Sequence, residues 1–273
     1  MTALIDADSI VYIVAWKYRD DENNEYLASI VKASIDLYIK AMLKIVNATA
    51  YLGVFSPPTE KVFRTAIYKM APYKGNRPAK SEWYTKWSEV IKSHLIQEWK
   101  FTQIATYVEA DDVVAYMHEC LGPESSIVLS PDKDLRQIPG LFFNYKHLTS
   151  APVVVTEQEA EFNYYMALLT GDAADNIMGI PGYGEVKAKK VLKECVGWLQ
   201  YEDAVMKAYT THFGWHYGLQ ILEETIKTVH LMTPSHKLYG GHADAVIQSS
   251  YRIVEYTQPD TDLDQALATL GWI

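Results

Sequence analysis

Several common features are scarce or missing in this sequence. Two cysteines occur among 273 residues, and Cys120 and Cys195 lack metal-type spacing. We therefore expect reduced thiols and a cytoplasmic protein, the host's cytoplasm if the chain is phage-encoded. No apolar run reaches the roughly 18–20 residues that a membrane span needs. The first residues also lack the basic stretch and apolar run of a signal peptide. These absences predict a protein that does not associate with membranes.

The chain lacks the positive net charge that is typical of proteins binding polyanions. Its formal net charge is −9. Net charge is a poor guide when charge is clustered, however. Residues 64–100 contain eight Lys and Arg against three Glu, and residues 183–193 contain four Lys against one Glu. Two basic segments in an acidic chain leave binding to a polyanion open.

The eight histidines form no spaced constellation with serine or cysteine that predicts a covalent nucleophile. About half of the residues are apolar, which is enough for a sizeable core and argues against global disorder. No repeat or low-complexity segment stands out. The chain is therefore expected to fold into one large domain or two smaller ones.

Strand and helix patterns alternate in the first 150 residues. We predict strands at Ala3–Ile5, Thr49–Phe55, Ser126–Leu129, Leu141–Tyr145 and Val153–Val155. We predict helices at Tyr26–Ile45, Ser81–Trp99, Ala110–Cys120, Glu157–Leu169, Val186–Cys195, Glu202–Tyr209 and Leu219–Leu231. The alternation predicts an α/β domain with a mainly parallel central sheet over residues 1–155. Residues 156–273 are predicted to be mostly helical.

Acidic side chains gather in four groups at the ends of apolar elements. The groups are Asp6 and Asp8; Glu109, Asp111 and Asp112; Asp132 and Asp134; and Asp172 and Asp175. The first and third groups follow predicted strands, where α/β proteins bind their ligands. Within a group the spacing lets two carboxylates point the same way: Asp132 and Asp134 in an extended segment, and Asp172 and Asp175 if they are helical.

Carboxylates brought together repel one another and need a compensating cation. Ligation by oxygen alone suits a hard ion, Mg²⁺ or Mn²⁺, and two such ions can stabilise the attacking and leaving oxygens of a phosphodiester. The nine carboxylates equal the whole charge deficit, since 34 acidic minus 25 basic residues is 9. Any single acidic pair is more often a solvated helix face or an N-terminal cap. The co-occurrence of four groups favours a metal site.

A glycine-rich segment at residues 179–184, called the glycine hairpin below, precedes a lysine-rich segment that is predicted to be helical. Gly179, Gly182 and Gly184 stand in the pattern G-x-P-G-x-G, and Lys187, Lys189 and Lys190 follow. Glycines let a phosphate approach the backbone, and the helix N-terminus and lysines attract anions. The alternative is an ordinary helix–turn–helix corner with solvated lysines.

A second segment mixes aromatic and basic residues. It runs Tyr73-Lys74-Gly75-Asn76-Arg77, and Trp83, Tyr84 and Trp87 follow it. Interleaved aromatics and cations suit an unpaired nucleic-acid strand through base stacking and backbone neutralisation. For Trp83 and Trp87 a place in the core is an equal alternative.

Taken together, these motifs resemble the 5′→3′ exonuclease/flap endonuclease family, particularly its phage-encoded members. The motifs are Leu4-Ile5-Asp6, Tyr73-Lys74-Gly75-Asn76-Arg77, Glu109-Ala110-Asp111-Asp112, Ser130-Pro131-Asp132-Lys133-Asp134, Gly171-Asp172-Ala173-Ala174-Asp175 and the glycine hairpin. They occur in the family order over roughly residues 1–195. The resemblance implies a PIN-like three-layer α/β nuclease domain followed by a helix–hairpin–helix-type region.

The resemblance also implies roles for individual residues. Two divalent ions, Mg²⁺ with Mn²⁺ as a substitute, are implied at Asp6, Glu109, Asp111, Asp112, Asp132, Asp134, Asp172 and Asp175, as direct ligands or through water. Lys74 and Arg77 match the basic pair that positions and polarises the scissile phosphate, with Tyr73 beside them, and Arg64 matches a phosphate-contacting arginine. Residues 68–100 match an arch for the 5′ strand. The glycine hairpin matches a duplex-binding motif that commonly holds K⁺.

One position departs from the family pattern. After the second strand the family usually has aspartate, and here Ser56 stands at that place. Asp8 or a water molecule on the metal is expected to fill the gap. The implied partners are DNA with a 5′ end or flap and also an RNA–DNA hybrid, and we expect a monomer.

Two other readings remain open. Asp6-Ala7-Asp8 after a strand also resembles the first motif of haloacid-dehalogenase-type phosphatases, although that reading leaves the glycine hairpin unexplained. Loss of a metal through Ser56 would instead leave a protein that binds flap DNA without cutting it.

Overall fold

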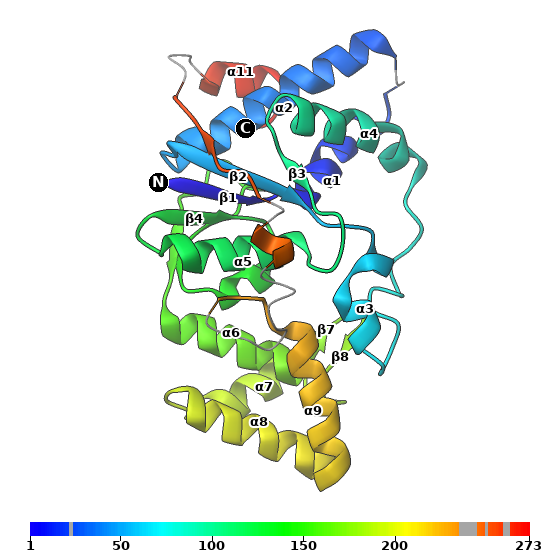
Figure 1. Cartoon of the computed structure of the whole chain (residues 1–273), viewed down its shortest axis with the longest axis vertical. Helices are drawn as coiled ribbons and strands as arrows, with labels where there is room; N and C mark the ends of the chain where they lie inside the picture. The colour runs from blue at the N-terminus through cyan, green and yellow to red at the C-terminus, as the bar shows by residue number, and fades with distance from the viewer. Residues whose placement is uncertain (22–23, 235–244, 249–250, 259–262) are drawn as a thin grey trace.

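A central sheet with helices on both faces forms the upper half of the molecule in Figure 1. The computed structural model describes residues 1–21, 24–234, 245–248, 251–258 and 263–273. The strands of this sheet are β1 (Thr2–Asp6), β2 (Ala50–Phe55), β3 (Thr102–Gln103), β4 (Ser126–Leu129), β5 (Gly140–Phe143), β6 (Val153–Val155) and β9 (Val254–Glu255). A separate hairpin joins β7 (Gly171–Asp172) to β8 (Ile177–Met178).

Each helix predicted in the first half of the chain is present with similar bounds. They are α1 (Asp8–Lys17), α2 (Glu25–Ile45), α3 (Phe63–Ile67), α4 (Glu82–Gln97), α5 (Ala110–Leu121), α6 (Glu157–Thr170), α7 (Glu185–Leu192), α8 (Trp198–Phe213), α9 (Trp215–Val229) and α11 (Leu263–Thr269). Two 3₁₀ helices, η1 (Thr59–Lys61) and η2 (Lys133–Gln137), are also present. Helices α1, α3 and α11 had not been predicted.

The order of the strands is β3-β2-β1-β4-β5-β6. Strands β1 to β5 pair in parallel, β6 is antiparallel to β5, and β9 is antiparallel to β2. The predicted α/β class with a mainly parallel sheet is therefore confirmed. Because the chain leaves β1 toward β2 and later returns beside β1 as β4, the carboxyl ends of β1 and β4 flank the point where the order reverses. Open α/β sheets bind ligands at such a point.

Alternation along the strands builds a core on each face of the sheet. In β1, Leu4 packs into the core shared with α5 and α6, whereas Ala3 and Ile5 pack into the core shared with α1, α2 and α4. Successive side chains of a strand point to opposite faces, so both faces of these central strands must be apolar. Their near-continuous apolar runs follow from this double burial.

Helix α4 belongs to one of these layers. It packs against α1 and α2 and buries Trp87, Ile91 and Leu95. Helix α4 therefore forms the second half of the segment at residues 68–100, for which an arch is proposed, and buries one of its faces. The segment between α3 and α4 remains as the connection that crosses from the lower to the upper part of Figure 1.

Helices α7, α8 and α9 lie beyond α6 at the far end of the molecule (Figure 1). This placement agrees with the predicted helical region. The last described residues do not, since β9 pairs with β2 and α11 packs on α2. The parts of the predicted region at 235–244, 249–250 and 259–262 lie outside the described residues.

No helix in the described part of the chain is both long and apolar enough to cross a membrane.

Candidate active site at the carboxyl edge of the sheet

Asp6 ends β1 and lies next to the end of β4. Its carboxylate accepts a hydrogen bond from the Ser130 hydroxyl at 3.0 Å and one from the Asp8 backbone N–H at 3.3 Å. Asp6 is only 7% exposed. Burial and the neighbouring Asp8 and Asp132 carboxylates raise the pKa of Asp6 to about 7. The carboxyl group therefore lies where its negative charge is costly unless a cation compensates it.

The side chain of Asp8 reaches the end of β2. Its two oxygens accept from the Ser56 backbone N–H at 3.2 and 3.3 Å. The Ser56 hydroxyl in turn accepts from the Ala110 N–H at 2.9 Å. Asp8 thus places a carboxylate beside Ser56, the position at which the sequence departs from the family pattern.

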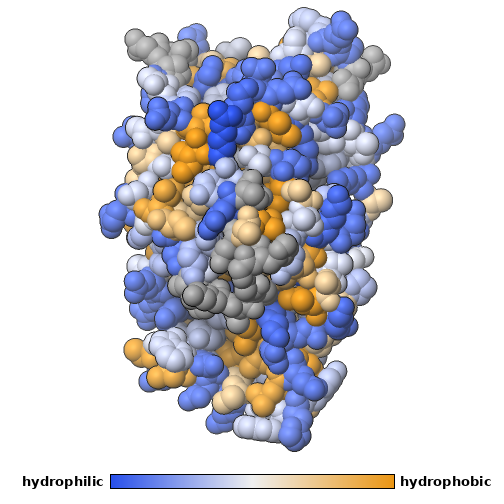
Figure 2. All heavy atoms as spheres, viewed as in Figure 1, coloured by the Kyte–Doolittle hydropathy of each residue, from blue (hydrophilic) through white to orange (hydrophobic). Residues whose placement is uncertain are grey.

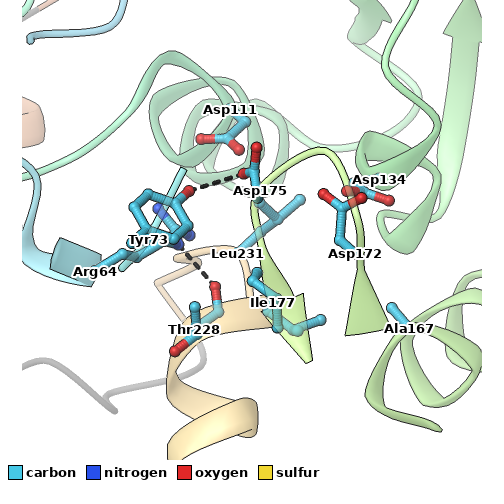
Figure 3. Close-up of a pocket in the computed structure, with 11 residues that line it drawn as sticks. Arg64, Tyr73, Asp111, Asp134, Ala167, Asp172, Asp175, Ile177, Thr228 and Leu231 are labelled. Atoms are coloured by element: carbon cyan, nitrogen blue, oxygen red, sulfur yellow. Dashed lines mark hydrogen bonds between the residues drawn. The ribbon is translucent and has the colours of Figure 1, made fainter. Parts of the chain in front are cut away.

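The first turn of α5 carries three acidic residues in two different settings. Glu109 is the N-cap, and Glu109 and Asp112 form a reciprocal capping box. Asp112 is 0% exposed and points away from solvent. Asp111 is half-buried and lines the pocket of Figure 3. Burial and Asp112 beside it hold the pKa of Asp111 well above its usual range.

Asp132 and Asp134 stand at the start of η2. Asp132 is its N-cap and accepts from the Asp134 N–H at 2.8 Å. Burial raises the pKa of Asp134 to about 7, and the Asp132 and Asp172 carboxylates add to the effect. Asp134 therefore faces carboxylates from its own turn and from a segment almost forty residues later in the chain.

Asp172 and Asp175 lie in a β-hairpin, so the condition that they be helical, under which they would share a turn, is not met. Gly171 at φ +68° ends α6, and the chain turns back as the β7–β8 hairpin. A residue with a side chain rarely adopts this φ, and a Cβ on Gly171 would lie 2.3 Å from the Gly179 nitrogen. Burial and Asp175 raise the pKa of Asp172. The hairpin tip, rather than a helix face, thus presents both groups.

One pocket collects acidic side chains from three of the four groups. Figure 3 shows Asp111 and Asp175 on one side and Asp134 and Asp172 on the other, with Tyr73 and Arg64 alongside. Asp6, Asp8 and Asp132 are coupled to the same set through their charges. As the side chains are placed, no three His, Cys, Asp or Glu in the described residues close around a single point. The carboxylates lie together at the carboxyl ends of the parallel strands, which we call the carboxylate edge, without forming a complete coordination shell.

The predicted basic pair lies beside these carboxylates. Lys74 donates to Glu109 at 2.5 Å and lies 3.5 Å from Asp175, and Arg77 is paired with Asp175. The Tyr73 hydroxyl lies 2.7 Å from a Glu109 oxygen and 2.9 Å from an Asp175 oxygen, so its one proton can be donated to either acid. Burial works against the charge of Lys74, but Glu109 and Asp175 raise its pKa, so it stays protonated at neutral pH.

The loop that carries this pair is attached to the β7–β8 hairpin. Lys74 N–H donates to the Asp175 carbonyl at 2.8 Å, and the Asn76 amide donates to the Ala173 carbonyl at 2.7 Å. From the hairpin, the Asn176 amide donates to the Pro72 carbonyl at 2.8 Å. Ser130 belongs to one of the quoted motifs and Asn176 directly follows another, but their hydrogen-bonding roles were not predicted from the sequence.

Arg64 is not placed as the prediction required. It is 2% exposed, and its guanidinium donates to Asp112, to Glu109 and to the carbonyls of Thr228 and His230. This leaves no accessible face for a DNA phosphate, so the assignment of Arg64 as a phosphate contact is corrected. The same bonds take both oxygens of Asp112, which argues against Asp112 as a direct metal ligand.

The glycine hairpin forms a tight turn ahead of α7. A Cβ on Gly179 would lie 2.2 Å from the Thr170 carbonyl carbon, and Gly182 has φ +79° with open space around it. Gly184 is the N-cap of α7. Lys187, Lys189 and Lys190 are exposed, with Lys189 paired to Glu185 and the Lys187 ammonium 3.8 Å from the Tyr183 ring centroid. A Cβ at Gly182 or Gly184 would meet no other atom within 4 Å, so the structure leaves space beside both glycines.

The aromatic residues after the basic loop divide between core and surface. Trp87 is fully buried and donates its indole N–H to the Tyr18 carbonyl at 2.8 Å. Trp83 is half-buried and packs edge-on against Tyr12 and Trp16 of α1, with ring centroids 5.3 Å apart in each case. Trp83 therefore remains available to an unpaired strand, and Trp87 does not.

Comparison with known proteins identifies the family. A family model described as 5′-3′ exonuclease, N-terminal resolvase-like domain, matches residues 1–164. The chain belongs to this 5′-3′ exonuclease family. The match begins at β1 and ends within α6, so it includes the Asp6, Lys74 and Asp134 groups and stops before the β7–β8 hairpin.

Individual family members are distant in sequence. Flap endonuclease Xni of Shewanella woodyi is 29% identical over 141 residues, which are 48% of this chain and 54% of that enzyme. The chain thus spans about half the length of this relative. Among solved structures, the 5′-exonuclease of bacteriophage T5 with bound divalent metal ions (zinc) gives a TM-score of 0.60 at 16% identity, covering 91% of this chain and 97% of that one.

A second T5 structure extends the comparison. The T5 D15 flap endonuclease in a pseudo-enzyme–product complex with DNA and metal ions gives a TM-score of 0.52 at 17% identity, covering 84% of this chain and 97% of that one. At these identities the likeness shows a shared fold.

Proposed function

We propose that this 5′-3′ exonuclease family member is a structure-specific 5′-nuclease that hydrolyses DNA phosphodiester bonds by two-metal catalysis in replication or repair. The observation that carries the proposal is the convergence at one sheet edge of carboxylates from four separate segments, represented by Asp6, Asp111, Asp134 and Asp172. A lysine and an arginine lie within ion-pair distance of the same edge. Phosphoryl transfer needs both features, cations held by carboxylates and positive side chains beside them.

The donor set fits hard divalent cations. It consists of carboxylate oxygens, and burial, with neighbouring carboxylates adding to the effect, raises the pKa values of Asp6 and Asp134 to about 7. Mg²⁺, or Mn²⁺ in its place, suits oxygen ligands and offsets this repulsion. Bound there, two ions would supply an activated water and neutralise charge on the leaving 3′-oxygen. Asp6, Asp8, Asp132, Asp134, Asp172, Asp111, Asp175 and Glu109 are the residues we expect to hold them, directly or through water.

The chain's own basic groups orient the substrate. Lys74 and Arg77 now pair with Glu109 and Asp175. We expect them to turn to the scissile phosphate when DNA enters and to hold it against the carboxylate edge. Tyr73, within hydrogen-bond distance of both acids, keeps the loop in place during this exchange. No covalent enzyme intermediate is needed.

The substrate we propose is DNA with a free 5′ end or a 5′ flap, with an RNA–DNA hybrid as a further substrate. The glycine hairpin at Gly179, Gly182 and Gly184, with K⁺ bound, would hold the duplex, and Lys187, Lys189 and Lys190 would contact its phosphates without reading sequence. The T5 relative in complex with DNA and metal ions supports this class of substrate. We expect the protein to act as a monomer in the cytoplasm.

A panel of substrates tests this function. Purified protein is incubated with 5′-flap, nicked, blunt and hybrid substrates in Mg²⁺ and in EDTA, and product lengths are read. Mg²⁺-dependent release of 5′ fragments supports the nuclease. Tight binding of the flap substrate without incision in Mg²⁺ or Mn²⁺ would support the alternative, a metal-deficient DNA-binding protein. The phosphatase reading is disfavoured by the family match and predicts turnover of phosphomonoesters only.

A further inference from the structure

Arg64 joins two parts of the chain that are far apart in sequence. From α3 its Nη1 and Nη2 donate to the two Asp112 oxygens at 2.6 and 2.7 Å, and Nη1 also donates to Glu109 at 3.0 Å. On its other side Nε donates to the Thr228 carbonyl at 2.8 Å and Nη2 to the His230 carbonyl at 3.1 Å. All three guanidinium nitrogens are thus engaged.

Asp112 completes the connection. It lies in the first turn of α5, next to Asp111 of the acidic pocket, and accepts from the Met232 N–H at 3.1 Å. The guanidinium and the carboxylate therefore both bind the chain at and just after the end of α9. This buried pair is the point at which α5 and the end of α9 meet.

The position of α9 also determines where the far end of the molecule lies. Helix α9 packs against α8 and α6, and α7 packs against both of those helices. Helix α7 follows the glycine hairpin directly. A displacement of the chain at Thr228 or His230 would therefore also displace the surface proposed to hold the duplex. That surface would then lie at a different distance from the carboxylates at the start of α5.

We infer that the Arg64–Asp112 pair is a positioning device that fixes the distance between the duplex-binding surface and the carboxylate edge, and so sets which phosphodiester bond is cut. The inference rests on the proposed nuclease function. A buried pair of this kind is weak evidence for stability alone, because desolvation offsets much of the attraction. Its planar, bidentate geometry does specify a fixed arrangement, which lysine cannot reproduce.

The test is the length of the product. A 5′-flap substrate labelled at its 5′ end is cut in Mg²⁺ by wild type, Arg64→Lys and Asp112→Asn. Lysine keeps the charge but loses the fork, and asparagine keeps the shape and one acceptor oxygen, so either variant can serve if the other folds poorly. Glu223→Gln, which breaks an exposed ion pair on α9, is the matched control.

We expect wild type and Glu223→Gln to give one dominant product, and the two pair variants to spread cleavage over neighbouring positions while duplex binding changes less than about threefold. A slower reaction with an unchanged product length would overturn the positioning role and leave a merely structural pair. Absence of cleavage by wild type would instead overturn the proposed function. The thermal midpoint of unfolding is measured for each variant to show that it is folded.

Discussion

The carboxylate of Asp8 accepts hydrogen bonds from the Ser56 backbone N–H at 3.2 and 3.3 Å. Asp8 begins α1 and Ser56 follows β2, and parallel pairing of β1 and β2 brings the two ends side by side. A side chain from one strand end can therefore supply the acid that is missing at the other. The acidic edge keeps its charge although it lacks the usual aspartate after β2.

This relationship predicts that the carboxylate can be supplied from either position, residue 8 or residue 56. Asp8→Asn should reduce Mg²⁺-dependent cleavage to below about one tenth of wild type, as loss of a ligand-supporting carboxylate does. The double variant Asp8→Asn with Ser56→Asp should recover most of it, because the carboxylate returns to the same corner. The measurement is the initial rate on a 5′-flap substrate. An inactive double variant that is folded and binds Mg²⁺ would show that Asp8 has another role.

Removal of a carboxylate from the pocket should separate binding from cutting. Asp134→Ala is expected to lower the cleavage rate below about 1% of wild type, by analogy with the cost of disturbing a metal site. Duplex affinity should change little, since the proposed duplex surface lies at the glycine hairpin. Asp36→Asn, on α2 in the opposite layer, is the control. Retained Mg²⁺-dependent cleavage by Asp134→Ala would contradict the metal assignment.

The raised pKa values of Asp6 and Asp134, about 7, predict a pH-dependent stability of the metal-free protein. The folded state binds protons that the unfolded state releases near pH 4, so stability should fall as pH rises from about 4 to about 7. In EDTA, Asp6→Asn should therefore gain in thermal midpoint over wild type at pH 8 and gain less at pH 5. Mg²⁺ should stabilise wild type more at pH 8 than at pH 5. A gain for Asp6→Asn that is equal at both pH values would contradict the raised pKa.

The lysines of α7 should contribute to DNA affinity through salt-dependent phosphate contacts. Each phosphate contact adds about 0.9 to the slope of log affinity against log salt concentration. Lys187→Gln with Lys190→Gln should thus lower the slope by roughly two for a duplex without a flap. Lys32→Gln with Lys44→Gln, which also removes two exposed lysines but from α2, controls for net charge. An unchanged slope would place the duplex elsewhere on the protein.

The sequence predicted the sheet well and the site only in part. The strands were recognisable because burial on both faces makes them apolar throughout, as in Leu4 and Ile5. Helix α1 was not predicted, because Asp8–Lys17 is largely apolar and its apolar residues show little helical periodicity. Motif order identified the acidic groups, because their positions are tied to the ends of strands and helices.

Long-range contacts set the limit of what the sequence could predict. The partners of Arg64 lie 45 or more positions away, so nothing local distinguishes a buried connecting arginine from a phosphate contact. The hairpin geometry of Asp172 and Asp175 depends on Gly171 packing against Gly179, which helical periodicity cannot reveal. Trp87 entered the core because α4 packs on α1, and its neighbours in sequence did not decide this.

The most direct measurement is anomalous diffraction from a crystal of the protein soaked in Mn²⁺. Strong peaks in the pocket lined by Asp111, Asp134, Asp172 and Asp175 would be the predicted result, together with their loss in Asp134→Ala. Wild-type crystals at saturating Mn²⁺ that show peaks only outside that pocket, or no peak at all, would contradict it.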